Sequence, residues 1–233
     1  MNSVGKRNQE SRDEWLEKTI KLIPSGSRVL DAGAGELKYK KYCTHLEYVA
    51  QDFAEYDGRG DESGLQMGTW DQSKLDLVSD ITSIPQPDAS FDAILCIEVF
   101  EHLPDPLAAI KEFTRLLKPG GHLIITSPFS SIAHFAPYYY YTGFSKYFYL
   151  THLENSGYNI AEIAVNGNYF EYLAQELRRV KSIGKKFANI RASFIEHLAI
   201  QLLLLMLGRL SRHDTGSSEL LHFGCQVHAT KQL

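Results

Sequence analysis

Short, continuous apolar segments recur through the first 126 residues, and each ends where polar residues break the pattern. Apolar runs of this length are typical of strands that are buried on both faces of a parallel sheet. Strands are predicted over residues 28–30, 47–50, 75–79, 91–97 and 122–126, with later ones over 160–165 and 223–230.

Apolar positions at helical spacing lie between these strands. The clearest helix covers residues 106–117, with Asp105 as the N-cap and Pro106 at the first helical position, and Lys118–Gly121 ends it. In a further helix over residues 11–24, Ser11 and Glu14 are placed to form a capping box. Other helices are predicted over residues 38–44, 145–156, 171–184 and 187–210.

The alternation of strands and helices indicates βαβ units. The predicted fold is therefore α/β: a Rossmann-like, doubly wound and mostly parallel seven-stranded sheet. Because about 55 residues separate the last two strands, and two of the predicted helices lie there, a helical insertion precedes the last strand.

Acidic residues stand at or just past the ends of four predicted strands. Because the carboxyl ends of parallel strands open onto one crevice, these side chains are expected to face a common ligand site. The four are Asp31, Asp52, Asp80 and Glu98. Gly33 and Gly35 follow Asp31, and such glycines allow a backbone to approach a ligand closely.

Two classes of ligand fit a glycine turn of this kind. A dinucleotide site has the pattern G-x-G-x-x-G, but Lys38 stands at the third glycine position, and Asp31 and Glu36 would repel a pyrophosphate. A nucleoside with a cationic, zwitterionic tail, such as S-adenosylmethionine, fits the acids better. Asp52 would then suit the ribose diol, and Asp80 with Ile81 would meet the adenine.

Four motifs also resemble, in order, those of the class I S-adenosylmethionine-dependent methyltransferases. They are VLDAGAGELKY, YVAQDF, SDITSIPQPDASFDAILCIEVFEHL and RLLKPGGHLIITSPF, and they cover residues 28–129. The resemblance implies that the methionine portion contacts Asp31, Gly33 and Gly35. It also implies that Asp52 binds the ribose, Phe53 packs on adenine, Asp80 reaches its amine and Glu98 lines the cofactor. The family pattern often has a third glycine where this chain has Leu37.

Methyl transfer from a sulfonium depends chiefly on alignment, but a hydroxyl acceptor benefits from a nearby base. His102 and His134 follow the fourth and fifth predicted strands and are the candidate catalytic residues. The predicted function is S-adenosylmethionine-dependent O-methylation of a small molecule or sugar-containing metabolite. An NAD-dependent oxidoreductase and a non-catalytic S-adenosylmethionine-binding scaffold are the alternatives.

Composition narrows the remaining choices. A net charge of −4 argues against a nucleic-acid partner, and three separated cysteines predict neither a disulfide nor a zinc site. No cluster of metal ligands is visible in the sequence, so no metal is expected. The N-terminal residues resemble no signal peptide, and the apolar run from Ile195 is too short to span a bilayer, which predicts a cytoplasmic protein.

The apolar helix near the C-terminus needs a covering surface. Its own domain, a dimer contact and a membrane surface are the candidates, in that order, and a homodimer through residues 195–210 is the predicted contact between copies. We predict one domain over residues 1–233, with residues 28–129 binding the cofactor. Residues 134–157 and 170–221 are expected to form the substrate pocket or its lid.

Overall fold

The computed structural model describes residues 3–233, which divide into two compact units. The sheet unit consists of residues 14–164 and 224–233, and the helical unit consists of residues 3–13 and 165–223. Each unit is built from two separate segments of the chain. The prediction of one domain over residues 1–233 stays a prediction.

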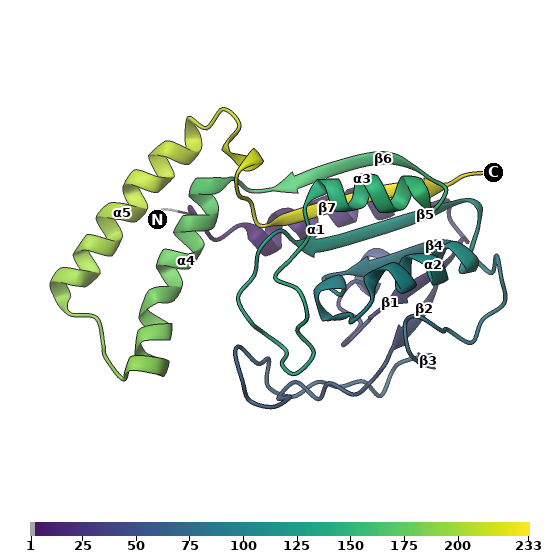
Figure 1. The fold of residues 1–233 in the computed structure, drawn as a ribbon, viewed down its shortest axis with the longest axis horizontal. Helices are drawn as coiled ribbons and strands as arrows, with labels where there is room; N and C mark the ends of the chain where they lie inside the picture. The colour runs from purple at the N-terminus through teal and green to yellow at the C-terminus, as the bar shows by residue number, and fades with distance from the viewer. Residues whose placement is uncertain (1–2) are drawn as a thin grey trace. The chain divides into compact units, whose positions relative to one another are not determined.

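The sheet has seven strands in the order β3-β2-β1-β4-β5-β7-β6 (Figure 1). Neighbouring strands from β3 to β5 run parallel, whereas β7 runs antiparallel to β5. The strands are β1 Arg28–Ala32, β2 Glu47–Asp52, β3 Leu77–Val78, β4 Phe91–Ile97, β5 Leu117–Pro128, β6 Tyr158–Asn166 and β7 Gly224–Lys231. This arrangement confirms the predicted fold class, including the helical insertion before the last strand.

Five α-helices accompany the described strands: α1 Asn8–Ile20, α2 Pro106–Leu116, α3 Lys146–Asn155, α4 Tyr169–Ile183 and α5 Phe194–Arg212. The Asp105 side chain accepts hydrogen bonds from the backbone N–H groups of Leu107 and Ala108, at 3.1 and 3.0 Å, so the predicted N-cap is confirmed. Short helical turns complete the elements: η1 Lys40–Tyr42, η2 Phe100–His102, η3 Gly184–Ala188 and η4 Ser217–Glu219.

Alternating side chains of the sheet pack against helices on its two faces. In β4, Ile94 and Cys96 belong to the apolar core that includes side chains of α2 and α3. Ala93, Leu95 and Ile97 point the other way and pack with Leu16 and Ile20 of α1. Residues 93–97 of β4 are all buried, so this part of the strand is a continuous apolar run rather than an alternating one.

Some predicted element ends were wrong. The first helix begins at Asn8, so Ser11 lies inside it and forms no capping box. The predicted helix over residues 38–44 is only the turn Lys40–Tyr42. Residues 118–121 do not follow α2 as a loop but belong to β5, which starts at Leu117 directly after the helix.

The helical unit is built on α4 and α5. Its core contains Val4, Ala174, Ile200, Leu204 and Leu207, each buried. The second helix begins at Phe194 rather than at residue 187, because Ser193 and Glu196 form a capping box there.

Candidate active site

A cavity of about 670 Å³ lies at the carboxyl ends of β1, β2, β3 and β4. Its wall contains seven of the predicted site residues: Gly33, Asp52, Phe53, Asp80, Ile81, Glu98 and His102. Side chains from two long loops complete it, including Tyr56, Trp70, Phe135, Tyr138 and Tyr140. Rings from these loops contact one another, since Tyr56 stacks on Phe135 with centroids 4.8 Å apart and Trp70 meets both rings edge-on.

The glycine turn at the end of β1 is held against β2. The N–H groups of Gly33 and Ala34 both donate to the carbonyl of Gln51, at 2.9 and 2.8 Å. Gly33 has a φ of +81°, and a Cβ there would lie 2.5 Å from the Val99 side chain. Leu37, where the family pattern often has glycine, also takes a left-handed φ of +61°. The turn therefore keeps a conformation that favours glycine even though the side chain is leucine.

Asp52 lies in the wall and also supports the turn. Its carboxylate accepts hydrogen bonds from the backbone N–H groups of Gly35 and Ala54, at 2.9 and 3.1 Å. Burial raises the pKa of this carboxyl group, and the N–H donors partly oppose that rise. Gly35 itself is outside the cavity wall, but it donates this hydrogen bond to the wall residue Asp52.

Asp31 does not line the cavity, and its contact with the methionine portion stays a prediction. It is buried and accepts a hydrogen bond from the hydroxyl of Tyr48 on β2. Burial raises the pKa of Asp31 to about 7; the Tyr48 hydrogen bond opposes this rise, and the nearby charge of Asp52 adds to it. Alternation along the strand explains the placement, because Val29 and Asp31 face the α1 side of the sheet and Leu30 and Ala32 face the other.

The other two predicted acids stand at strand ends in the wall. Asp80 accepts hydrogen bonds from the backbone N–H and the hydroxyl of Thr82, both at 2.7 Å. Glu98 accepts a hydrogen bond from the Thr126 hydroxyl at 2.9 Å and has a left-handed φ of +57°.

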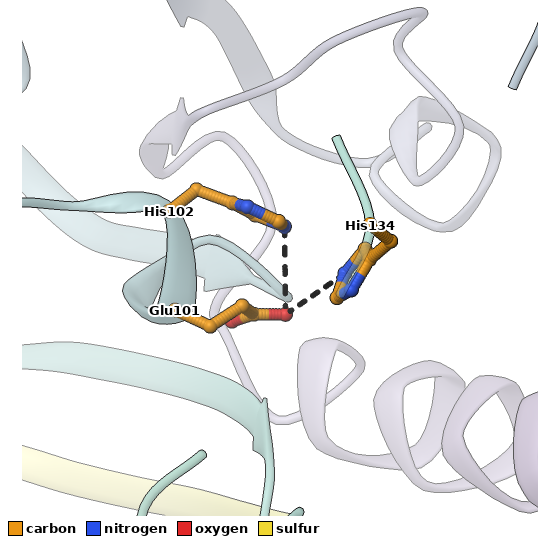
Figure 2. A group of neighbouring side chains, drawn as sticks. All are labelled: Glu101, His102 and His134. Carbon is orange, nitrogen blue, oxygen red and sulfur yellow. Dashed lines mark ion pairs between the residues drawn. The ribbon is translucent and has the colours of Figure 1, made fainter. Parts of the chain in front are cut away.

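Next to the cavity, Glu101, His102 and His134 point toward one another (Figure 2). The Glu101 Oε1 atom lies 3.7 Å from His102 Nε2 and 3.9 Å from His134 Nε2. The Glu101 side chain is only 1% exposed, and the His134 side chain is 22% exposed. His134 is not in the cavity wall itself, but its ring lies 4.7 Å from that of His102, which is.

Backbone carbonyls determine which nitrogen of each imidazole carries the proton. His102 Nδ1 lies 2.5 Å from the carbonyl oxygen of Tyr138, and His134 Nδ1 lies 2.9 Å from that of Ile132. A carbonyl only accepts hydrogen bonds, so both Nδ1 atoms are donors, and in the neutral rings both Nε2 atoms carry a lone pair. Burial lowers the pKa of His102 to about 4; the positive charge of His134 acts in the same direction, and the Tyr138 hydrogen bond opposes it.

Two nitrogen lone pairs and a carboxylate oxygen thus meet at one point, within 4.8 Å of one another. Such a group can take up a proton from a neighbouring hydroxyl, and its three donor atoms are also of the kind that hold a divalent cation. The sequence named both histidines but did not predict that they meet Glu101. His134 is 32 residues from His102 and reaches it through a loop without periodic pattern.

Comparison with known proteins agrees with this geometry. Residues 30–125 match the family model of a methyltransferase domain. This segment of the chain carries a methyltransferase domain of the class I S-adenosylmethionine-dependent kind.

Two curated relatives and two solved structures illustrate how far this chain resembles known proteins. It is 34% identical over 131 residues to a ubiquinone biosynthesis O-methyltransferase of Xylella fastidiosa (strain M23), covering 53% of this chain and 50% of the relative. The corresponding protein of Xanthomonas oryzae pv. oryzae (strain PXO99A) is 37% identical over 125 residues, with 51% and 50% covered. The chain spans about half the length of these relatives.

The solved structures show the fold alone. A SAM-dependent methyltransferase from Archaeoglobus fulgidus has a TM-score of 0.58 at 19% identity, covering 96% of this chain and 94% of that one. The [4+2]-cyclase SpnF also has a TM-score of 0.58, at 16% identity, with 97% and 82% covered.

The cavity wall fits S-adenosylmethionine, the cofactor of the matched family. The wall contains five carboxylates, from Asp52, Glu55, Asp80, Glu98 and Asp105, and no lysine or arginine. A wall with this charge favours a cationic sulfonium and disfavours the pyrophosphate of a dinucleotide. The charge of the wall and the family match over residues 30–125 both favour S-adenosylmethionine over a nicotinamide dinucleotide.

The sequence did not predict several residues of the cavity wall. Gln51 is buried beside Asp52; its Nε2 donates to the carbonyl of Ser79 at 2.7 Å, whereas its Oε1 meets no donor within the described residues 3–233. A polar residue directly before the acid at the end of a buried strand was the available signal. Trp70 gave none, because its loop has no periodic pattern.

Proposed function

We propose that this chain is an S-adenosylmethionine-dependent O-methyltransferase acting on a small molecule or a sugar-containing metabolite. The observation that supports it most directly is the acidic cavity at the ends of β1 to β4, which carries the wall residue His102 beside His134 and Glu101. Curated relatives with about half their length matched are O-methyltransferases by name, which favours oxygen as the acceptor atom.

The cofactor's parts are assigned to the wall by chemistry. Asp52 takes the ribose hydroxyls, Phe53 packs on the adenine, and Asp80 with Ile81 receives the adenine edge. Gln51 Oε1 is a buried acceptor in the same wall, so it suits a donor group of the nucleoside. The methionine portion lies along Gly33 and Glu98. Asp31 and Gly35, predicted as direct contacts, lie outside the cavity wall, and Gly35 donates a hydrogen bond to the wall residue Asp52.

Bound S-adenosylmethionine supplies a methyl group on a positively charged sulfur. Because the sulfur leaves as a neutral thioether, the leaving group needs no further activation. The chain's own contribution is to align the acceptor and to remove its proton. In this proposal His134 Nε2 accepts the hydroxyl proton, and the Glu101 carboxylate stabilises the resulting imidazolium. His102, with its lowered pKa, stays neutral and positions the acceptor.

The remaining predictions concern the surroundings of the site. Residues 134–157 contribute Phe135, Tyr138 and Tyr140 to the wall, which supports a role in the acceptor pocket. Three further statements stay predictions: that residues 170–221 contribute a lid, that the protein is cytoplasmic, and that residues 195–210 form a homodimer contact.

The test combines binding with turnover. Calorimetry with S-adenosylhomocysteine should show binding, and labelled S-adenosylmethionine should transfer its methyl group to members of a panel of phenols, catechols and hydroxylated sugars. His134→Ala should lower the rate by about 100-fold or more while leaving S-adenosylhomocysteine affinity unchanged. Binding without any transfer across the panel would favour the non-catalytic scaffold, and no binding would remove the methyltransferase assignment of this site.

A further inference from the structure

The connection between α4 and α5 in the helical unit is exposed over an unusual length. Every residue from 185 to 199 is solvent-exposed. Four large apolar side chains in this run are among the most exposed of the described chain: Phe187 at 68%, Ile190 at 65%, Phe194 at 84% and Ile195 at 77%. Leaving this much apolar surface in water is costly, which indicates that something covers it.

Positive charge accompanies these apolar side chains. Residues 177–195, which we call the hairpin tip, contain six basic residues and no acidic residue. The basic residues are Arg178, Arg179, Lys181, Lys185, Lys186 and Arg191. The whole chain has a net charge of −4, so the tip is a local exception to an acidic protein.

The apolar surface continues along α5. At about 100° per residue, the buried residues Ile200, Leu204 and Leu207 lie on one side of this helix. The opposite half carries exposed large apolar side chains and, before Arg209, no charged one; its members are Phe194, Ile195, Leu198, Leu202, Leu203, Leu205 and Met206. The prediction that this apolar segment is too short to span a bilayer was wrong for the helix as it forms, because α5 is long and apolar enough by length and composition. Only 17% of its most apolar stretch is buried.

We propose that the hairpin tip and the exposed half of α5 dock this protein onto the surface of an anionic lipid bilayer. Exposed phenylalanine and isoleucine side chains enter the boundary between headgroups and acyl chains, and the neighbouring lysine and arginine side chains bind lipid phosphates. The helix lies in the plane of the interface, because the buried side of α5 stays packed on α4.

A second copy of the chain fits this surface less well. A two-fold contact centred on the tip would bring two sets of six positive charges together. The exposed apolar half of α5 is also much wider than the narrow seam by which two helices pair. An anionic bilayer satisfies both the charge and the breadth of the surface.

Vesicle sedimentation tests the proposal. The full-length protein should sediment with vesicles of phosphatidylcholine and phosphatidylglycerol, and sediment far less with phosphatidylcholine alone. Lys185→Ala with Arg191→Ala should weaken binding by about 30-fold, since each basic residue contributes about fivefold. Phe187→Ser with Phe194→Ser should weaken it by about 100-fold or more. Lys74→Ala with Lys111→Ala, a charge-matched pair of exposed lysines in the sheet unit, should leave binding unchanged.

A fluorescent probe gives a readout that does not depend on a loss of binding. The chain's two tryptophans, Trp15 and Trp70, both belong to the sheet unit. Phe187→Trp should add a blue-shifted emission on anionic vesicles and be quenched by brominated lipid, whereas Tyr147→Trp, at a position 64% exposed on α3, should show neither effect.

Three results would overturn the proposal. One is equal sedimentation of the wild type with both kinds of vesicle or with neither. Another is unchanged binding of the two tip variants. The third is a dimer that light scattering detects in the wild type and that Phe187→Ser with Phe194→Ser dissociates, while the wild type does not bind vesicles. A second copy of the chain would then cover this surface.

Discussion

At the scale of single residues, burial decides what each predicted acid can do. Asp52 and Asp80 lie in the cavity wall, but Asp31, near the end of β1, is enclosed on the other face of the sheet. A buried carboxyl group is held near its protonated form unless donors compensate for the lost hydration. Tyr48 provides one such donor, and the pKa of Asp31 nevertheless rises to about 7.

This raised pKa predicts a pH dependence of stability. Between the ordinary value of 3.8 and about 7, the folded protein binds more protons at Asp31 than the unfolded chain does, so stability falls as the pH rises through this window. The loss is complete above pH 7 and amounts to at most about 4 kcal/mol. Asp31→Asn should flatten the difference between urea midpoints measured at pH 5 and pH 8.

Tyr48→Phe is the matched variant for this measurement. Removal of the hydroxyl donor should raise the pKa of Asp31 further and enlarge the loss of stability toward high pH. If the urea midpoint changed equally between pH 5 and pH 8 in the wild type and in Asp31→Asn, Asp31 would be ionised in the folded protein at both pH values.

Asp52 is expected to affect cofactor binding more than any other acid. Asp52→Ala removes the acceptor that holds Gly35 and Ala54, and with it the two hydrogen bonds that we propose to the ribose diol. Calorimetry should show S-adenosylhomocysteine binding at least about 10-fold weaker. Asp57→Ala removes a similar set of backbone contacts, to Arg59 and Gly60, outside the wall, and should leave affinity intact; an equal loss would assign the effect to loop structure alone.

Sequence alone located the strand-end acids because strand ends and topology are local and regular features. It could not assign the face on which Asp31 lies, since a one-residue shift in alternation reverses the answer. It also named His102 and His134 without showing that Glu101 joins them. That contact depends on how a loop of aromatic residues folds back, and no periodic pattern encodes such a path.

At the scale of elements, the turn between β1 and η1 positions the site. Gly33 combines a left-handed backbone with a close approach to Val99, and both favour glycine for different reasons. The backbone conformation would cost a larger residue about 1–2 kcal/mol, and the contact would add to it.

Gly33→Ala and Gly26→Ala separate these two costs. Gly26 has a φ of +79°, close to the +81° of Gly33, but a Cβ at Gly26 would meet nothing within 4 Å. Both variants should lose the backbone share of stability in a urea melt, and Gly33→Ala should lose clearly more. Gly33→Ala should also weaken S-adenosylhomocysteine binding, and adding Val99→Ala should restore part of the stability. Identical melting of the two alanine variants would mean that the turn moves away from Val99 at no cost.

Element types were predictable where a pattern extends over several turns or a whole strand. The strand over residues 91–97 and the helix beginning at Pro106 were placed correctly, because a buried run and an N-cap are strong signals. The start of α5 was misplaced, since Lys185 to Ala188 continue a helical composition although the α-helix resumes only after the Ser193 cap.

At the scale of the whole molecule, the chain divides its tasks between two units. All residues of the cavity wall belong to the sheet unit, whereas the hairpin tip belongs to the helical unit. The family match over residues 30–125 also falls within the sheet unit. The helical insertion was predictable as an insertion, but its exposed apolar face was not, because the sequence shows how apolar a helix is and not how much of it a neighbour covers.

This division predicts where a bound cofactor changes the protein. A ligand that binds only the folded state stabilises it by about 2.7 kcal/mol at 100 times its dissociation constant, and the protection falls on the segments whose opening destroys the site. Hydrogen exchange with saturating S-adenosylhomocysteine should therefore slow in residues 33–37, 51–56, 79–82 and 98–108, which contribute or support the wall. Residues 177–195 should exchange at an unchanged rate. Anionic vesicles should produce the opposite pattern. Hydrogen exchange should slow at the hairpin tip and stay unchanged in the cavity wall. If S-adenosylhomocysteine protected the tip as strongly as the wall, the two units would act as one cooperative structure, and the separation of catalysis from docking would be wrong.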